Sequence, residues 1–77
     1  MKNRLKYYRM QREPKILQQE IAEHIGTDAA QISQMENGHY IPSLKVALLV
    51  AEAYTKLLGE KVYVDNLFSL ERTDRKR

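Results

Sequence analysis

The sequence predicts a compact all-α domain of five helices. Apolar residues recur at steps of three and four, which is the spacing of one face of a helix. The 3 glycines and 2 prolines stand where such helices would stop or turn. Only residues 62–64 have strand propensity, and the chain shows no second segment of that kind. With 77 residues there is room for one domain; we expect it over residues 1–70, with a basic, disordered tail over 71–77.

The first helix is expected to open at residues 3–6 and to run for about ten residues. Leu5, Tyr8 and Met10 give it an apolar side, and Pro14 forces its end by residue 13.

The second and third helices are joined by a tight turn at Gly26, because glycine adopts the left-handed conformation that ends helices. Asp28 is suited to cap the third helix, and Gln31 could return a bond as in a capping box. Asn37 and Gly38 end that helix. The second helix, which starts at residue 18, lacks such a cap, since a leucine precedes it. Inward stripes are expected at Leu17, Ile21, Ala22 and Ile25, and then at Ile32 and Met35.

A long fourth helix should follow Ser43, a good N-cap, and end at Gly59. Residues 62–64 then form an extended lead into a last helix near residues 65–69. The fourth helix should turn a broad apolar face inward, formed by Leu44, Ala47, Leu48, Val50, Ala51, Tyr54, Leu57 and Leu58.

The chain resembles the lambda-repressor-like, Xre/Cro-type family of helix-turn-helix regulators. The resemblance rests on residues 3–6, on Gln18, Ala22 and Gly26, on residues 32–38 and 42–44, on Ala47, Val50, Ala51 and Ala53, and on residues 65–68. Each of these signals is weak by itself. Because they occur together, in order and at near-family spacing, the combination is specific for the family. The resemblance implies a five-helix DNA-binding domain whose second and third helices form the helix-turn-helix.

The third helix is then the recognition helix, which presents its N-terminal part to the major groove. Glutamine can bond bidentately to adenine, and alanine can pack on the thymine methyl group. The resemblance places Ala29, Ala30, Gln31 and Gln34 at the positions that face bases. The alternative for both glutamines is a solvent-exposed amide, and for Gln31 also a cap contact.

This helix carries no Lys or Arg, so phosphate attraction must come from its flanks. By the resemblance, Gln18 bonds a backbone phosphate and Ser33 lies at the edge of the reading face. Asn37, His39, Tyr40 and Lys45 are further candidates, although Tyr40 could instead pack against the fourth helix. The basic residues gather in segments 1–15 and 72–77, a distribution compatible with binding to phosphates. The family pattern also pairs Arg9 with Glu36 in a partly buried salt bridge.

The sequence gives no support for an enzyme. The pair Glu20 and His24 could begin a metal site, but nothing completes it, so we expect no metal and no cofactor. There is no cysteine, which suits a reducing interior. The longest apolar run is too short to span a bilayer, and no signal peptide precedes it. We therefore expect a cytoplasmic protein.

The function expected from these features is a sequence-specific regulator, most simply a repressor, that binds a pseudo-palindromic operator in double-stranded DNA as a homodimer. The alternative is a protein-interaction module on the same scaffold, such as an antitoxin or an anti-repressor partner. The dimer should form through apolar residues of the C-terminal region, namely Leu57, Leu58, Val62, Tyr63, Val64, Leu67 and Phe68.

Overall fold

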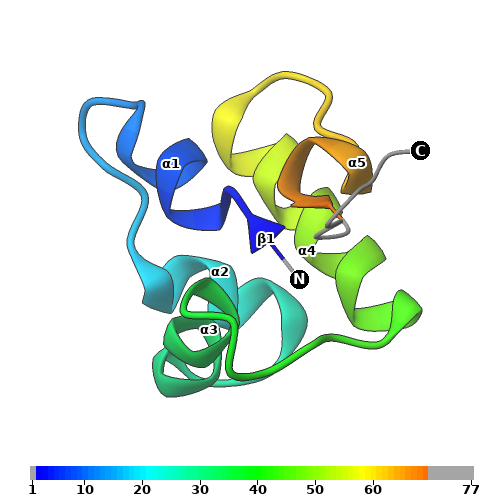
Figure 1. The fold of residues 1–77 in the computed structure, drawn as a ribbon. Helices are drawn as coiled ribbons and strands as arrows, with labels where there is room; N and C mark the ends of the chain where they lie inside the picture. Colours follow the sequence, from blue (N-terminus) through cyan, green and yellow to red (C-terminus); the bar gives the residue numbers. More distant parts are fainter. Residues whose placement is uncertain (1, 70–77) are drawn as a thin grey trace.

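The computed structural model describes residues 2–69 as five helices and one small sheet (Figure 1). The helices are α1 (Leu5–Met10), α2 (Gln18–Ile25), α3 (Ala29–Glu36), α4 (Leu44–Leu58) and α5 (Val64–Leu67). The all-α, five-helix prediction is confirmed at the level of fold class. The basic tail expected over residues 71–77 lies outside the described residues.

Helix α4 is the longest element and supports most of the others. It packs against α2 on one side and α5 on the other, while α2 also packs on α3. Figure 1 shows α2 and α3 together on one side of α4, with α5 near β1 on the other. The core lies between these elements and consists of Leu5, Ile16, Ile21, Ala22, Ile32, Met35, Ala47, Val50, Ala51, Tyr54, Val62, Leu67 and Phe68.

Local signals set the ends of α4. Ser43 accepts a hydrogen bond from the backbone N–H of Val46 at 3.3 Å, which satisfies one of the unpaired donors of the first turn. Gly59 ends the helix in the left-handed conformation, with φ of 77°. Tyr54, fully buried, donates its hydroxyl to the carbonyl of Leu5 at 2.8 Å and so ties α4 to α1.

The first helix is shorter than predicted at both ends, and at its start the residues before it form a strand. Strand β1 (Lys2–Asn3) pairs antiparallel with β2 (Phe68–Ser69), and the N–H of Arg4 donates to the carbonyl of Leu67 at 2.7 Å. Asn3 also donates its amide to the carbonyl of Met35 at 2.8 Å. Helix α1 therefore begins only at Leu5, and it ends at Met10, well before the proline expected to stop it.

The same pairing shortens the last helix. Helix α5 starts at Val64, one residue before the predicted start, and stops at Leu67, because Phe68 and Ser69 extend to pair with β1. The lead into α5 is extended as expected, with Tyr63 at ψ of 158°.

Four predicted apolar-face positions were wrong. Leu17 stands at the N-cap of α2 and is exposed, and Leu44 and Leu48 point outward from α4. Met10, expected on the apolar side of α1, is exposed as well. These residues follow the helical spacing, but no other element covers them. The pattern shows which residues share a face and cannot show where the neighbouring elements end.

Candidate nucleic-acid interface

Helices α2 and α3 form a helix-turn-helix joined at Gly26. Gly26 adopts the left-handed conformation with φ of 81°, and its N–H and that of Thr27 both donate to the carbonyl of Ala22 at 2.9 Å. These bonds close the end of α2 and turn the chain sharply into α3. Ala22 is fully buried, so its small side chain lets the two helices approach closely.

The N-terminus of α3 is held by Asp28, which accepts a hydrogen bond from the backbone N–H of Gln31 at 2.9 Å. The expected return bond from the side chain of Gln31 is not formed: among residues 2–69, no hydrogen bond involves its amide group. The cap thus has one half of a capping box, and the Gln31 amide is available to another partner.

The outer face of α3 is uncharged. Ile32 and Met35 are buried, as predicted, and fix the rotation of the helix. Ala30 and Gln34 are exposed, and Ala29, Gln31 and Ser33 are half-buried. The four predicted base-contacting residues therefore share one helix that carries no Lys or Arg, and Ala30 and Gln34 are more open on it than Ala29 and Gln31.

The predicted phosphate-contacting residues come from α2, α3, the loop after α3 and the start of α4. Gln18 is the first residue of α2, Asn37 caps the C-terminus of α3, and Lys45 is the second residue of α4. His39 is exposed in the connecting loop, where its N–H donates to the carbonyl of Gln34 at 2.9 Å. Tyr40 is half-buried and packs against the core. Part of its surface is therefore used in packing, which was the alternative to a phosphate contact for this residue.

Arg9 and Glu36 form a bidentate ion pair between α1 and the end of α3. Arg9 Nε donates to Glu36 Oε2 at 2.6 Å, and Nη2 donates to Oε1 at 3.1 Å. The two side chains are only 11% and 6% exposed. Hydrogen bonding to Glu36 raises the pKa of Arg9, burial opposes this, and the charge of Glu36 adds to the rise.

Two further bonds complete this network, and neither was predicted from the sequence. Arg9 Nη1 donates to the carbonyl of Ile16 at 3.1 Å, which fixes the chain entering α2. Gln18 Nε2 donates to Glu36 Oε1 at 3.0 Å. Gln18, expected to contact a phosphate, is therefore already held by a carboxylate that also faces Arg9. Gln18 and Glu36 belong to different helices, and Arg9 reaches Ile16 across the loop between α1 and α2, so helical spacing reveals neither contact.

The seven residues predicted to form a dimer differ in how far they are exposed. Val62, Leu67 and Phe68 are buried in the core of the same chain, and Leu57, Leu58 and Val64 are half-buried. Of the seven residues, Tyr63 alone is exposed. Val62, Leu67 and Phe68 thus serve the core of their own chain, and little of their surface is left for a partner.

Among residues 2–69, no group of three or more His, Cys, Asp or Glu side chains could hold a metal ion. In the same part of the chain, no helix is long and apolar enough to cross a membrane.

These features define a helix-turn-helix domain: two short helices at a glycine turn, with a polar, uncharged second helix exposed. The profile of the helix-turn-helix family matches residues 5–60. An uncharacterised HTH-type transcriptional regulator of Methanocaldococcus jannaschii is 39% identical over 62 residues, which cover 80% of this chain and 85% of the relative. No solved structure gave a significant match. The chain belongs to the lambda-repressor-like, Xre-type helix-turn-helix family of DNA-binding domains.

Proposed function

We propose that the protein is a sequence-specific transcriptional regulator that inserts α3 into the major groove of double-stranded DNA. The observation that carries this proposal is the outer face of α3, which is open, uncharged and held rigidly by its cap and by Ile32 and Met35. Family membership and the regulator name of the archaeal relative support it. Repression is the simplest mode, because occupation of a promoter is sufficient for it.

Base reading falls to the residues on that face. Gln31 and Gln34 present amides that can bond bidentately to adenine, while Ala29 and Ala30 can pack on thymine methyl groups. The free amide of Gln31 supports this assignment, because the competing cap bond is absent among the described residues.

Phosphate contacts flank the reading face. We assign these contacts to the N-terminus of α2, to α3 and the loop after it, and to the start of α4. Helix N-termini favour anions, and such contacts fix register without reading sequence. The residues proposed for this role are Gln18, Ser33, Asn37, His39, Tyr40 and Lys45.

The proposed operator is pseudo-palindromic, with half-sites about one helical turn, or roughly 34 Å, apart. A single α3 reads only a few base pairs, so two copies related by a two-fold axis extend the site.

Selection of bound duplexes from a random pool, followed by salt titration of the enriched sequence, tests the proposal. We expect a defined half-site and an affinity that falls as salt rises, because phosphate contacts release counterions. If no sequence is enriched at low salt, sequence-specific regulation is ruled out.

The exposed apolar residues Leu44 and Leu48 favour a second candidate, a protein-interaction module without DNA specificity. The same selection separates the two, since this candidate predicts no enrichment at all.

A further inference from the structure

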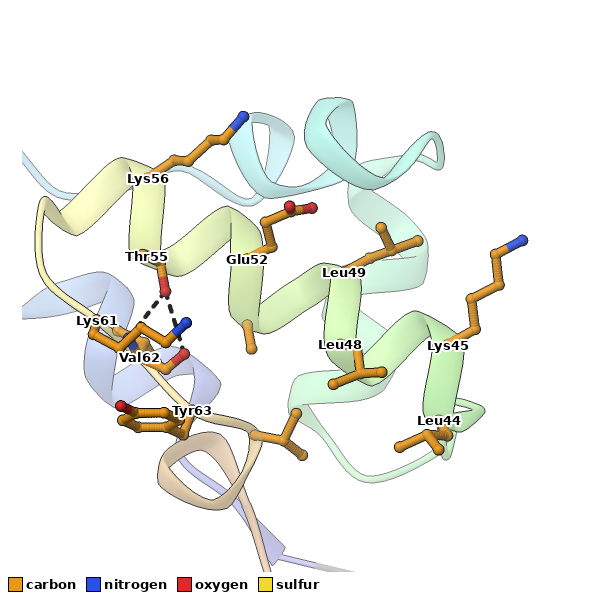
Figure 2. Close-up of a pocket in the computed structure, with 12 residues that line it drawn as sticks. Leu44, Lys45, Leu48, Leu49, Glu52, Thr55, Lys56, Lys61, Val62 and Tyr63 are labelled. Carbon is orange, nitrogen blue, oxygen red and sulfur yellow. Dashed lines mark hydrogen bonds between the residues drawn. The ribbon is translucent and has the colours of Figure 1, made fainter.

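An open groove runs along the outer side of α4. Its volume is about 810 Å³, and every residue that lines it comes from α4 or from residues 61–64. Thr55 Oγ1 donates to the carbonyl of Val62 at 3.2 Å and accepts from the N–H of Val62 at 2.9 Å, which fixes the second wall to α4 (Figure 2). Since α2 and α3 contribute nothing to the lining, the groove is separate from the reading face.

The middle of the groove is apolar and uncovered. Leu44, Leu48 and Tyr63 are 72%, 53% and 60% exposed, although all three are large side chains. Their exposure is not scattered, because they line the same groove. A contiguous apolar patch with polar residues at its edge is typical of a surface that binds a partner.

The charged residues of the groove are mostly positive. Three lysines and one glutamate line it, all of them exposed: Lys45, Lys56, Lys61 and Glu52. Glu52 lies one helical turn before Lys56, so it balances part of one lysine charge within the chain. Among residues 2–69 the one salt bridge joins Arg9 to Glu36, so the remaining positive charge of the groove is not paired there. This excess favours an anionic partner.

The lysines stand at the two ends of the apolar surface. Figure 2 shows Lys45 at the end near Leu44, and Lys56 and Lys61 at the opposite end. Lys56 lies in the last turn of α4, where a cation also stabilises the helix itself. Lys61 has no such role, because it follows the helix, and its ammonium stands 5.3 Å from the centroid of the Tyr63 ring.

The length of the groove indicates the form of the partner. From Leu44 to Lys56 it follows α4 for about 12 residues, or about 18 Å. A small ligand would leave much of such an open trough empty, whereas ligand pockets usually enclose their ligands. An amphipathic helix of the same length places apolar side chains at steps of three and four along the trough. Acidic residues at its ends then reach the lysines.

We propose that the α4 groove docks an acidic amphipathic helix of a partner protein. Leu44, Leu48 and Tyr63 contact its apolar face, while Lys56 and Lys61 pair with carboxylates at one end. Lys45, which is also proposed to contact a phosphate, faces the other end. The proposal does not rest on DNA binding, because the groove and the reading face share no element except where α4 begins. A regulator built in this way accepts its partner without withdrawing α3.

Selection from a display library of random peptides of about 16 residues, against the full chain and without DNA, is the first test. We expect the enriched peptides to combine apolar residues at steps of three and four with Asp and Glu near their ends. A synthetic copy of an enriched peptide then serves as the probe in fluorescence anisotropy. Its affinity should fall as salt rises, because the charges of the groove are exposed to solvent.

Variants of the groove locate the binding site of that peptide. Leu48→Glu should weaken binding about tenfold or more, because it removes an apolar contact and places a carboxylate against an acidic peptide. Tyr7→Glu is the matched control, since Tyr7 is 58% exposed on α1 and does not line the groove. If Leu48→Glu loses helical circular dichroism, Leu44→Glu replaces it.

A charge exchange tests the lysines without relying on the leucines. Lys61→Glu should weaken binding of the acidic peptide about tenfold, whereas Lys6→Glu, an exposed change on α1 outside the groove, should leave it within about twofold. A peptide whose acidic residues are replaced by lysine should bind Lys61→Glu more tightly than the wild type. A purely structural role of Lys61 cannot produce this reversal.

Several results would overturn the proposal. These are a selection that enriches no peptide, enriched peptides that are neutral or basic, and binding that neither Leu48→Glu nor Lys61→Glu changes. Sedimentation of the full chain tests a second copy as the occupant, and self-association that Leu48→Glu abolishes would also overturn it. A nucleic acid is the occupant instead if Lys61→Glu lowers affinity for DNA while no peptide binds. Failure to enrich any duplex would count against the proposed function alone, because peptide binding is measured without DNA.

Discussion

Replacement of Glu36 by alanine should be among the most destabilising single changes in this chain. The carboxylate accepts two bonds from Arg9 and one from Gln18, and both charged side chains are nearly excluded from water. In the Glu36→Ala variant the guanidinium keeps only the carbonyl of Ile16 as a partner. An unpaired buried charge is costly, whereas the net worth of the intact pair is small.

The expected loss is about 3 kcal/mol. Breaking a buried pair from one side costs roughly 3–5 kcal/mol, and the residual exposure of both side chains places this pair at the lower end. Domains of this length have total stabilities of roughly 4–11 kcal/mol, so the variant loses a large share. For a chain of this size the midpoint of thermal unfolding should fall by about 12–24 °C.

Urea denaturation followed by circular dichroism measures this loss. The double variant Arg9→Met/Glu36→Ala should be more stable than the sum of its single changes predicts, with a coupling of about 1–3 kcal/mol. Glu23→Ala is the control, because this exposed carboxylate on α2 accepts only a long bond from Gln19 at 3.4 Å, and its change should stay within about 0.5 kcal/mol. A loss below about 1 kcal/mol for Glu36→Ala, or additive single changes, would refute the reasoning.

Three further predictions follow from single residues. Leu17→Ser should stabilise the protein by about 0.5–1 kcal/mol in urea denaturation, because the exposed N-cap of α2 has extended backbone but no side-chain acceptor. Burial, and to a lesser degree the charge of Glu36, raises the pKa of Tyr54, while Arg9 opposes the rise. As the pH rises, the unfolded chain therefore loses the Tyr54 proton before the folded chain does. The free energy of unfolding should fall above about pH 10, by up to about 1.4 kcal/mol per pH unit. The Tyr54→Phe variant should lack this slope, and an unchanged slope in that variant would contradict the assignment. In competition binding, Gln34→Ala should relax the base preference at one position of the operator, at a cost of about 1–3 kcal/mol. Gln18→Ala should instead lower the affinity for all duplexes alike. Equal losses of affinity on every sequence for both variants would contradict this division of roles.

The helices around the turn could be predicted because their signals are local. Gly26, Asp28, Ser43 and Gly59 each act on backbone groups within a few residues, so their effects can be read without knowing the fold. The predicted bounds of α2, α3 and α4 agree with the structure for this reason.

The ends of the domain could not be predicted in the same way. Residues 2 and 3 pair with 68 and 69, and Asn3 bonds to the end of α3. Two-residue strands carry no period that a sequence could show. Long-range pairing therefore decides where α1 begins and where α5 ends, and it overrides the local preference for helix.

The same limit applies to the site. The amphipathic pattern of α4 marks Leu44 and Leu48 as apolar, but only the positions of α2 and α5 determine that these two remain uncovered. Conversely, Val62, Leu67 and Phe68 looked available for a partner because their own core partners are distant in the sequence. The predicted dimer stays a prediction, and Tyr63 is the exposed member of the seven residues predicted to form it.

The position of Glu36 explains why the buried pair matters for the proposed DNA contact as well as for folding. This carboxylate touches the Gln18 amide at the start of α2, where a phosphate is expected. An uncompensated carboxylate there would repel the phosphate, and Arg9 cancels that charge through two bonds. Arg9→Met should therefore weaken binding to all duplexes beyond what its stability loss explains. Arg9→Met/Glu36→Gln, which removes both charges, should bind closer to the wild type when each variant is assayed at a temperature where it is folded. Equal affinities for the single and the double variant would show that the pair only stabilises the fold.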